Sequence, residues 1–128
     1  MSALSDYAET LLANFIANAT TATRPTTRYL ALFTAAPSDS GGGTEVSGSG
    51  YARQAVTFGA ASSGVTANTS THTYTAAGGA WGTITHFGIF DALTGGNLLW
   101  HGAVTTSRTI ADGESLTVAA SAFTLTLA

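Results

Sequence analysis

Short runs in which apolar residues alternate with threonine, separated by glycine-rich turns, constrain the fold of this chain more than any other sequence feature. The clearest run closes the chain, where Phe123, Leu125 and Leu127 alternate with Thr124 and Thr126. A period of two is typical of a strand that buries one face, and β-branched threonine favours strands. We expect the three apolar side chains to face a core and the threonines to face outward.

Further segments have strand composition. Residues 27–33 (TRYLALF) have apolar side chains at both odd-numbered and even-numbered positions, as in a strand buried on two faces. Residues 83–90 (TITHFGIF) form the strongest strand segment, and the turn residues 94–97 (TGGN) predict a hairpin after it. Alternation within 83–90 predicts Phe87 and Ile89 on one face, and Ile84, His86 and Phe90 on the other. The remaining predicted strands are 51–58, two short segments within 64–75, 98–101, 107–110 and 116–119.

One amphipathic helix is predicted within residues 4–20. Its apolar positions recur with helical spacing at Leu4, Tyr7, Ala8, Leu11, Leu12, Phe15, Ile16 and Ala19. Asp6 followed by Glu9 resembles a capping box, and both carboxylates favour the helix start. Arg24-Pro25 stops the helix, because the residue before proline avoids the helical conformation.

Residues 38–50 (SDSGGGTEVSGSG) predict a long flexible loop. The chain has 128 residues, which suits one domain spanning 1–128, since domains typically contain about 100–150 residues. About seven or eight short strands after one helix indicate a mainly β fold. We expect an antiparallel β-sandwich, jelly-roll-like or partly closed as a barrel, with one N-terminal helix.

Charge is sparse. Only 9% of residues are charged, the formal net charge is −3, and the four cations are all arginines, at positions 24, 28, 53 and 108. Phosphate binding needs a clustered basic face, so no nucleic-acid partner is expected. The N-terminal segment carries Asp6, Glu9, Asn14 and Asn18, so neither membrane insertion nor Sec export is expected. The absence of cysteine excludes disulfides and thiolate chemistry.

A surface this poor in charge favours association, because surfaces normally carry about 25–35% charged residues. A monomer kept soluble by its hydroxyl groups is the alternative. The predicted helix has no partner helix in the sequence, so its stripe covers either the open end of the sandwich or an identical stripe in another copy. The candidate assembly interface is Leu4, Leu11, Leu12, Phe15 and Ile16.

No constellation for catalysis stands out. His86 and His101, on paired strands with Asp91 nearby, are the best candidates for a two-histidine, one-carboxylate metal site. Local hydrogen bonding is the preferred interpretation of these histidines, and no G-x-S-x-G elbow or paired carboxylates occur. We expect no enzyme, no catalytic residue, no metal and no cofactor.

The aromatic residues allow two interpretations. Trp81, Tyr74 and Trp100 are favoured as core side chains, and the alternative is a surface that stacks on a glycan. If one of them is exposed, Trp81, which follows Gly78-Gly79-Ala80, is the best candidate.

Three blocks in the chain resemble small tailed-bacteriophage virion proteins commonly labelled tail-fibre or minor structural proteins. They are 29–34 (YLALFT) with Pro37, 44–58 (TEVSGSGYARQAVTF), and 81–91 (WGTITHFGIFD) followed by 94–99 (TGGNLL).

The resemblance implies a non-enzymatic structural component of the virion, assembled in the host cytoplasm. The resemblance does not decide between a place on the tail and one on the capsid shell. We expect a tail-associated or fibre-like subunit present in many copies, with copies of itself and other virion proteins as partners. A capsid decoration (cement) protein that bridges capsomers is one alternative. A glycan-binding adhesion module that recognises the host surface is another.

Overall fold

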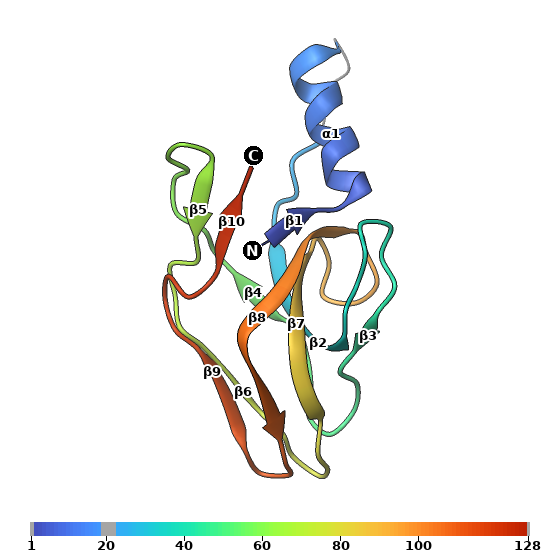
Figure 1. The fold of residues 1–128 in the computed structure, drawn as a ribbon, viewed down its shortest axis with the longest axis vertical. Helices are drawn as coiled ribbons and strands as arrows, with labels where there is room; N and C mark the ends of the chain where they lie inside the picture. Colours follow the sequence, from blue (N-terminus) through green and yellow to red (C-terminus); the bar gives the residue numbers. More distant parts are fainter. Residues whose placement is uncertain (1, 19–22, 128) are drawn as a thin grey trace.

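The computed structural model describes residues 2–18 and 23–127, and it consists mainly of antiparallel strands with one helix (Figure 1). The elements are β1 (Ser2–Leu4), α1 (Asp6–Ala17), β2 (Arg28–Ala35), β3 (Thr44–Glu45), β4 (Gln54–Val56), β5 (Val65–Ala67), β6 (His72–Thr75), β7 (Gly82–Phe90), β8 (Leu98–Ile110), β9 (Ser115–Val118) and β10 (Thr124–Thr126). The predicted fold class is confirmed. The described part of the chain has ten strands, more than the predicted seven or eight, because β1 and β3 were not anticipated.

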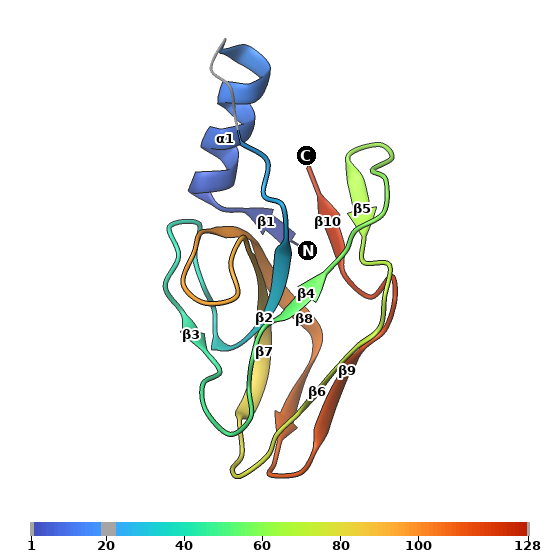
Figure 2. The same cartoon turned by 180° about the vertical axis from the view of Figure 1, so that it is seen from behind.

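The strands form one large sheet and two narrow ribbons. The six-stranded sheet has the order β1-β8-β7-β2-β3, and β4 also pairs with β2. The ribbons are β10-β5 and β6-β9, which follow one another along the side of the sheet (Figures 1 and 2). Leu32 and Ile89 of the sheet share one buried cluster with Tyr74, Val118 and Leu125 of the ribbons. The core therefore lies between two layers, as in a β-sandwich, and the sheets do not close into a barrel.

Strand β2 is an internal strand of the sheet. It pairs with β7 along one edge and with β3 and β4 along the other. Its residues Leu30, Ala31, Leu32 and Phe33 are all buried. The sequence prediction of burial on both faces is confirmed, since an apolar run without alternation is stable only where both faces are covered.

A large bulge interrupts the pairing of β7 with β8. Ile84 lies opposite Arg108, but His86 lies opposite Ala103, so residues 104–107 of β8 face only the one residue between them on β7. Such a bulge bends a strand and breaks its alternation. Ile84 consequently joins Phe87 and Ile89 in the core cluster. The prediction that Ile84 faces away from them was wrong, whereas the predicted hairpin after β7 is confirmed.

Residues 38–50 are more ordered than a flexible loop. They include β3, which pairs with β2, and Val46, which is buried and donates its N–H to the Leu32 carbonyl at 3.0 Å. Gly43 has a φ of +75°, and a Cβ there would lie 2.7 Å from the Pro37 nitrogen. The glycines therefore allow the backbone to follow a tight, specific path. The prediction of a long flexible loop over residues 38–50 was wrong.

The C-terminal alternation is confirmed in part. Phe123 and Leu125 are buried, and Phe123 packs on Phe87 with ring centroids 4.3 Å apart. Leu127 is 46% exposed. The prediction for this third side chain was wrong because β10 ends at Thr126, which pairs with Val65 of β5, and Leu127 lies one residue beyond that pairing.

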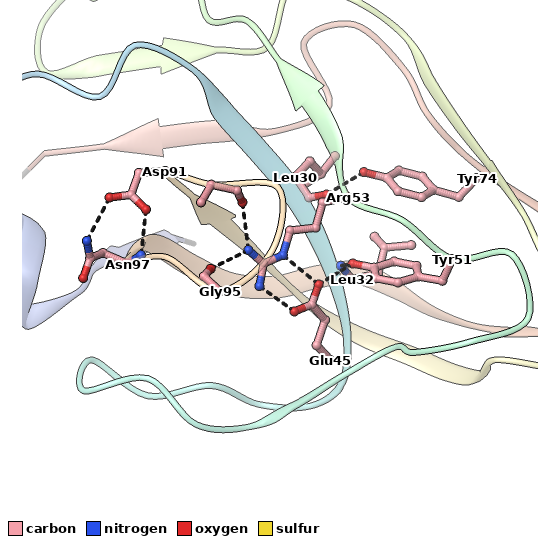
Figure 3. Close-up of polar contacts among 10 residues, drawn as sticks. Leu30, Leu32, Glu45, Tyr51, Arg53, Tyr74, Asp91, Gly95 and Asn97 are labelled. Atoms are coloured by element: carbon pink, nitrogen blue, oxygen red, sulfur yellow. Dashed lines mark hydrogen bonds and ion pairs between the residues drawn. The ribbon is translucent and has the colours of Figure 1, made fainter.

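The side chain of Arg53 joins β3 to the loop between β7 and β8 (Figure 3). The Arg53 guanidinium donates to both carboxylate oxygens of Glu45, at 2.9 and 2.8 Å. Its Nη1 donates to the carbonyls of Ala92 and Gly95, at 2.9 and 2.8 Å. Its carbon Cζ lies 3.7 Å from the centroid of the Phe90 ring. This side chain therefore fixes β3 against the loop between β7 and β8.

Two tyrosines connect the strands through their hydroxyl groups. The Tyr51 hydroxyl donates to Glu45 Oε2 at 2.8 Å and accepts from the Leu32 N–H at 3.0 Å. The Tyr74 hydroxyl donates to the Leu30 carbonyl at 2.7 Å. Burial raises the pKa of both phenols well above the ordinary value, and the nearby Glu45 carboxylate raises the pKa of Tyr51 further. Both phenols therefore remain protonated donors in the folded chain.

The alkaline stability of the protein tests this arrangement. The unfolded chain releases the two phenolic protons above about pH 10, whereas the folded chain keeps them. The free energy of unfolding is therefore expected to be insensitive to these groups below pH 10 and to fall above it. Tyr74→Phe should make the total fall in the free energy of unfolding between about pH 9 and about pH 11, measured by urea unfolding, smaller by about 1.4 kcal/mol. An identical fall in the wild type and the variant would contradict the assignment.

The Arg53 contacts predict a large loss of stability on substitution. Arg53→Met removes both guanidinium hydrogen bonds to the Glu45 carboxylate, which keeps the Tyr51 hydroxyl as a donor, and it removes the donor to the Ala92 and Gly95 carbonyls. The free energy of unfolding should fall by about 3–5 kcal/mol. Arg108→Met is the matched control, because Arg108 is exposed and makes no ion pair within residues 2–18 and 23–127. It should change stability by less than about 0.5 kcal/mol. Equal effects of the two substitutions in denaturant titrations would refute the role of Arg53.

Candidate assembly surface

Ser5 joins the helix to the sheet. It is 1% exposed, and its N–H donates to the Leu99 carbonyl at 2.9 Å. Its hydroxyl donates to the Leu98 carbonyl and accepts from the Ala8 N–H at 3.2 Å, so Ser5 caps α1. The prediction that Asp6 caps the helix was wrong, because serine fills the cap while its N–H also extends the contact with β8.

Leu4 lies in β1 rather than in the helix. It is paired with Trp100 of β8, so it contacts the sheet before the helix begins. The helix ends at Ala17, where the N–H of Asn18 donates to the Asn14 carbonyl at 3.2 Å. The predicted helical positions 19 and 20 lie outside the described residues.

The helix extends away from one end of the sandwich (Figures 1 and 2). Ala8, in the first turns, is its buried residue, and Leu11 and Leu12 are half-buried. Phe15 is 67% exposed and Ile16 is 79% exposed. Only the start of the apolar stripe is therefore covered by the chain's own sheet, and its far half projects outward.

An apolar cavity of about 360 Å³ lies beside the helix. Its walls are α1, the segment that leads back to β2, and the start of β8; its lining includes Leu11, Leu12, Phe15, Arg24, Arg28 and Trp100. Arg28 Nη1 donates to the Pro25 carbonyl at 3.2 Å, while its Nε is buried without a hydrogen-bond partner. We call this cavity together with the exposed residues Phe15 and Ile16 the helix groove.

The candidate interface residues are thus brought together, and two contributors were missed. Leu4, Leu11, Leu12 and Phe15 all line the helix groove, with Ile16 exposed one residue further along α1. The sequence reading did not include Arg24 and Arg28. The position of these two arginines could have been predicted. A short segment that leads from the end of a helix to a strand near the start of the same helix must run back along that helix.

The three aromatic candidates for a ligand surface lie in different places. Tyr74 and Trp81 are buried, and Trp81 Nε1 donates to the Ser49 carbonyl at 3.0 Å. Trp81 also packs edge-on against Tyr51, with ring centroids 5.6 Å apart. The prediction that Trp81 is the most exposed of the three was wrong, because residues 48–51 fold over it. Trp100 is half-buried and lines the helix groove.

The histidines do not converge on one site. His86 Nδ1 lies 2.8 Å from the Thr85 hydroxyl, and His101 Nε2 lies 2.8 Å from Asp39 Oδ1. Asp91 instead accepts from the backbone N–H and the side-chain amide of Asn97, at 2.7 and 2.9 Å. Within the described part of the chain, no group of three histidine, aspartate or glutamate side chains is arranged to hold a metal ion.

In the helix groove, large exposed apolar side chains lie beside an apolar cavity, an arrangement whose burial by another macromolecule is favourable. In the same described residues, no helix has the length and apolar character needed to span a membrane.

Comparison with known families gives one assignment, and comparison with curated proteins gives no match. The family described as "Podophage GP4 fiber I protein gp80" matches residues 3–126. This match covers the last two residues of β1 and the whole of α1 and of β2 to β10. The chain therefore belongs to the family of the podophage GP4 fibre I protein gp80, a family of structural phage fibre proteins.

Proposed function

We propose that this chain is a subunit of a phage tail fibre or of its attachment to the tail, present in several copies and held in place through the helix groove. The family assignment supports a structural role in a phage fibre and an association with other virion components. The exposure of Phe15 and Ile16 at the end of α1 is the observation that carries the assembly part of the proposal.

The energetics favour burial of this surface. Complete burial of a leucine, isoleucine or phenylalanine side chain stabilises an association by about 1.5–3 kcal/mol. Phe15 and Ile16 are the two most exposed large hydrophobic side chains in the described chain. The sandwich has a complete core without them. They are therefore free to contribute to an interface without any rearrangement of the fold.

Capsid decoration and glycan adhesion are less well supported. The family description names a fibre protein, which favours the fibre over the capsid shell. Adhesion through Trp81 and Tyr74 would require their rings at the surface, and both are in the core. Trp100 offers only part of its ring, inside the apolar helix groove.

Incorporation into phage particles tests the proposal. Phe15→Glu together with Ile16→Glu places two carboxylates in the contact surface, where burial of a charge is strongly unfavourable. The number of copies of the chain per purified particle, measured by quantitative mass spectrometry, should fall at least about tenfold, which corresponds to about 1.4 kcal/mol or more. Both side chains are exposed, so the isolated variant should retain the wild-type circular dichroism spectrum and thermal midpoint.

Thr10→Glu together with Ala17→Glu is the matched control. Both positions are exposed, and Thr10 lies two residues before Leu12, on the opposite side of the helix. This variant carries the same added charge and should be incorporated as well as the wild type. Wild-type copy numbers for the Phe15 and Ile16 variant would disprove assembly through the helix groove.

A further inference from the structure

The helix groove is basic as well as apolar. Arg24 and Arg28 line it, whereas no acidic side chain of the described chain does so. Asp6 lines a different cavity. Neither arginine forms an ion pair within residues 2–18 and 23–127. Half of the chain's four cations therefore lie, unpaired, beside one apolar surface.

Arg24 places its charge where another molecule can reach it. The residue is exposed, four positions before the start of β2, on the segment that runs back beside α1 (Figures 1 and 2). Apart from the arginines, the lining of the groove is almost entirely apolar. An arginine stem packs on apolar surface while its guanidinium stays in water. The groove is therefore an apolar strip with positive charge at its rim.

Two buried donors at the groove have no acceptor. Three side-chain atoms of the described residues are buried without a hydrogen-bond partner: Nε of Arg28, Nε1 of Trp100 and Nε2 of His72. Arg28 and Trp100 both line the helix groove, whereas His72 lies in β6. The Arg28 and Trp100 nitrogens are both N–H donors. Since buried donors normally have an acceptor, oxygen atoms of a bound molecule would be stabilised at this groove.

The chain itself has few free carboxylates for such a contact. Five of its seven acidic side chains already form ion pairs or accept hydrogen bonds within the fold; these are Asp39, Glu45, Asp91, Asp112 and Glu114. The other two, Asp6 and Glu9, lie in the first turn of α1, where the helix N-terminus stabilises negative charge. A different chain is therefore the better source of a carboxylate.

A symmetric pair of copies does not supply the complementary charge. A two-fold contact sets one surface of a copy against the same surface of the other copy. At the helix groove this would bring the arginines of both copies into one contact, and like charges across a contact are unfavourable. A partner that carries carboxylates is attracted to the same surface instead.

We propose that the helix groove binds an apolar segment of a different virion protein, and that this segment carries a carboxylate in contact with Arg24. Phe15 and Ile16 are buried against the apolar side chains of that segment. A guanidinium forms strong, oriented hydrogen bonds with a carboxylate, so Arg24 sets the position and direction of the segment. The inference rests on the proposed assembly role of the helix groove and identifies the chemistry of its occupant.

Charge reversal at the rim tests the carboxylate. Arg24→Glu repels an acidic partner, so the number of copies per purified particle should fall at least about tenfold. Arg24→Lys keeps the positive charge and should be incorporated far better than Arg24→Glu. Arg108→Glu is the matched control, because Arg108 is exposed on β8 and lines a different cavity. It should be incorporated as well as the wild type. Arg24 and Arg108 are exposed, so all three isolated variants should keep the wild-type thermal midpoint.

Photochemical crosslinking from the same surface identifies the occupant. The photoreactive residue p-benzoylphenylalanine replaces Ile16, which is exposed in the isolated chain. Purified particles are irradiated, and the crosslinked peptides are sequenced by mass spectrometry. The expected crosslink joins position 16 to an apolar segment of a different virion protein that contains aspartate or glutamate. Irradiation of particles that carry Arg24→Glu as well should give at least about tenfold less of this crosslink.

Several results would overturn the proposal. They are wild-type incorporation of Arg24→Glu, an equal loss of Arg108→Glu, a crosslink only to another copy of this chain or to a segment without a carboxylate, and no crosslink at all. Loss of the Phe15 and Ile16 variant from particles that still incorporate Arg24→Glu would reject the acidic occupant and leave the fibre role supported. Wild-type copy numbers of the Phe15 and Ile16 variant would reject the assembly role itself.

Discussion

The pairing of β2 with strands on both of its edges is the interaction on which the rest of the structure depends. β7 pairs with one edge of β2, and β3 and β4 pair with the other, while Leu30 and Leu32 are buried in one core cluster with side chains of the ribbons. The side chains that stabilise this arrangement come from β6 and from the residues just before β4. Tyr51 and Tyr74 form hydrogen bonds with the β2 backbone, and Arg53 holds β3 against the loop between β7 and β8. Of the helix, Ala8 belongs to the core cluster of the sandwich, whereas Phe15 and Ile16 do not.

The position of α1 is set at its start. Ser5 fixes that start to β8 through buried hydrogen bonds, and in the later turns Phe15 and Ile16 are largely exposed among the described residues. A helix in water depends mainly on tertiary packing of its apolar face. A 12-residue helix with its most hydrophobic turn exposed is therefore best explained by a contact with another chain. That requirement fits the family of structural fibre proteins to which the chain belongs.

Much of the fold could be predicted from local pattern, because burial and alternation act residue by residue. The two-sided burial of β2, the hairpin after β7 and the single helix all follow from such patterns. The bulge of β8 could not be predicted, since it depends on how many residues of β8 lie opposite Thr85 of β7. The order within residues 38–50 depends on long-range contacts of Glu45 and Val46.

The assembly surface shows the same division. Leu11, Leu12, Phe15 and Ile16 follow from helical spacing, but their exposure depends on where β1 and Ser5 direct the helix. The contribution of Arg24 and Trp100 depends on tertiary structure that places them on the same groove. The burial of Trp81 could not be predicted from its neighbours in the sequence. The nearby glycines suggested exposure, whereas residues 48–51 fold over the ring.

The central claim is that the exposed end of α1 is covered by protein in the assembled virion. A cryo-electron microscopy map of the intact particle, with this chain located in it, tests that claim most directly. We expect the chain to lie in the tail fibre or where the fibre attaches to the tail, with the Phe15 and Ile16 side chains buried against a neighbouring subunit. A chain whose α1 faces solvent in the assembled particle would contradict the account.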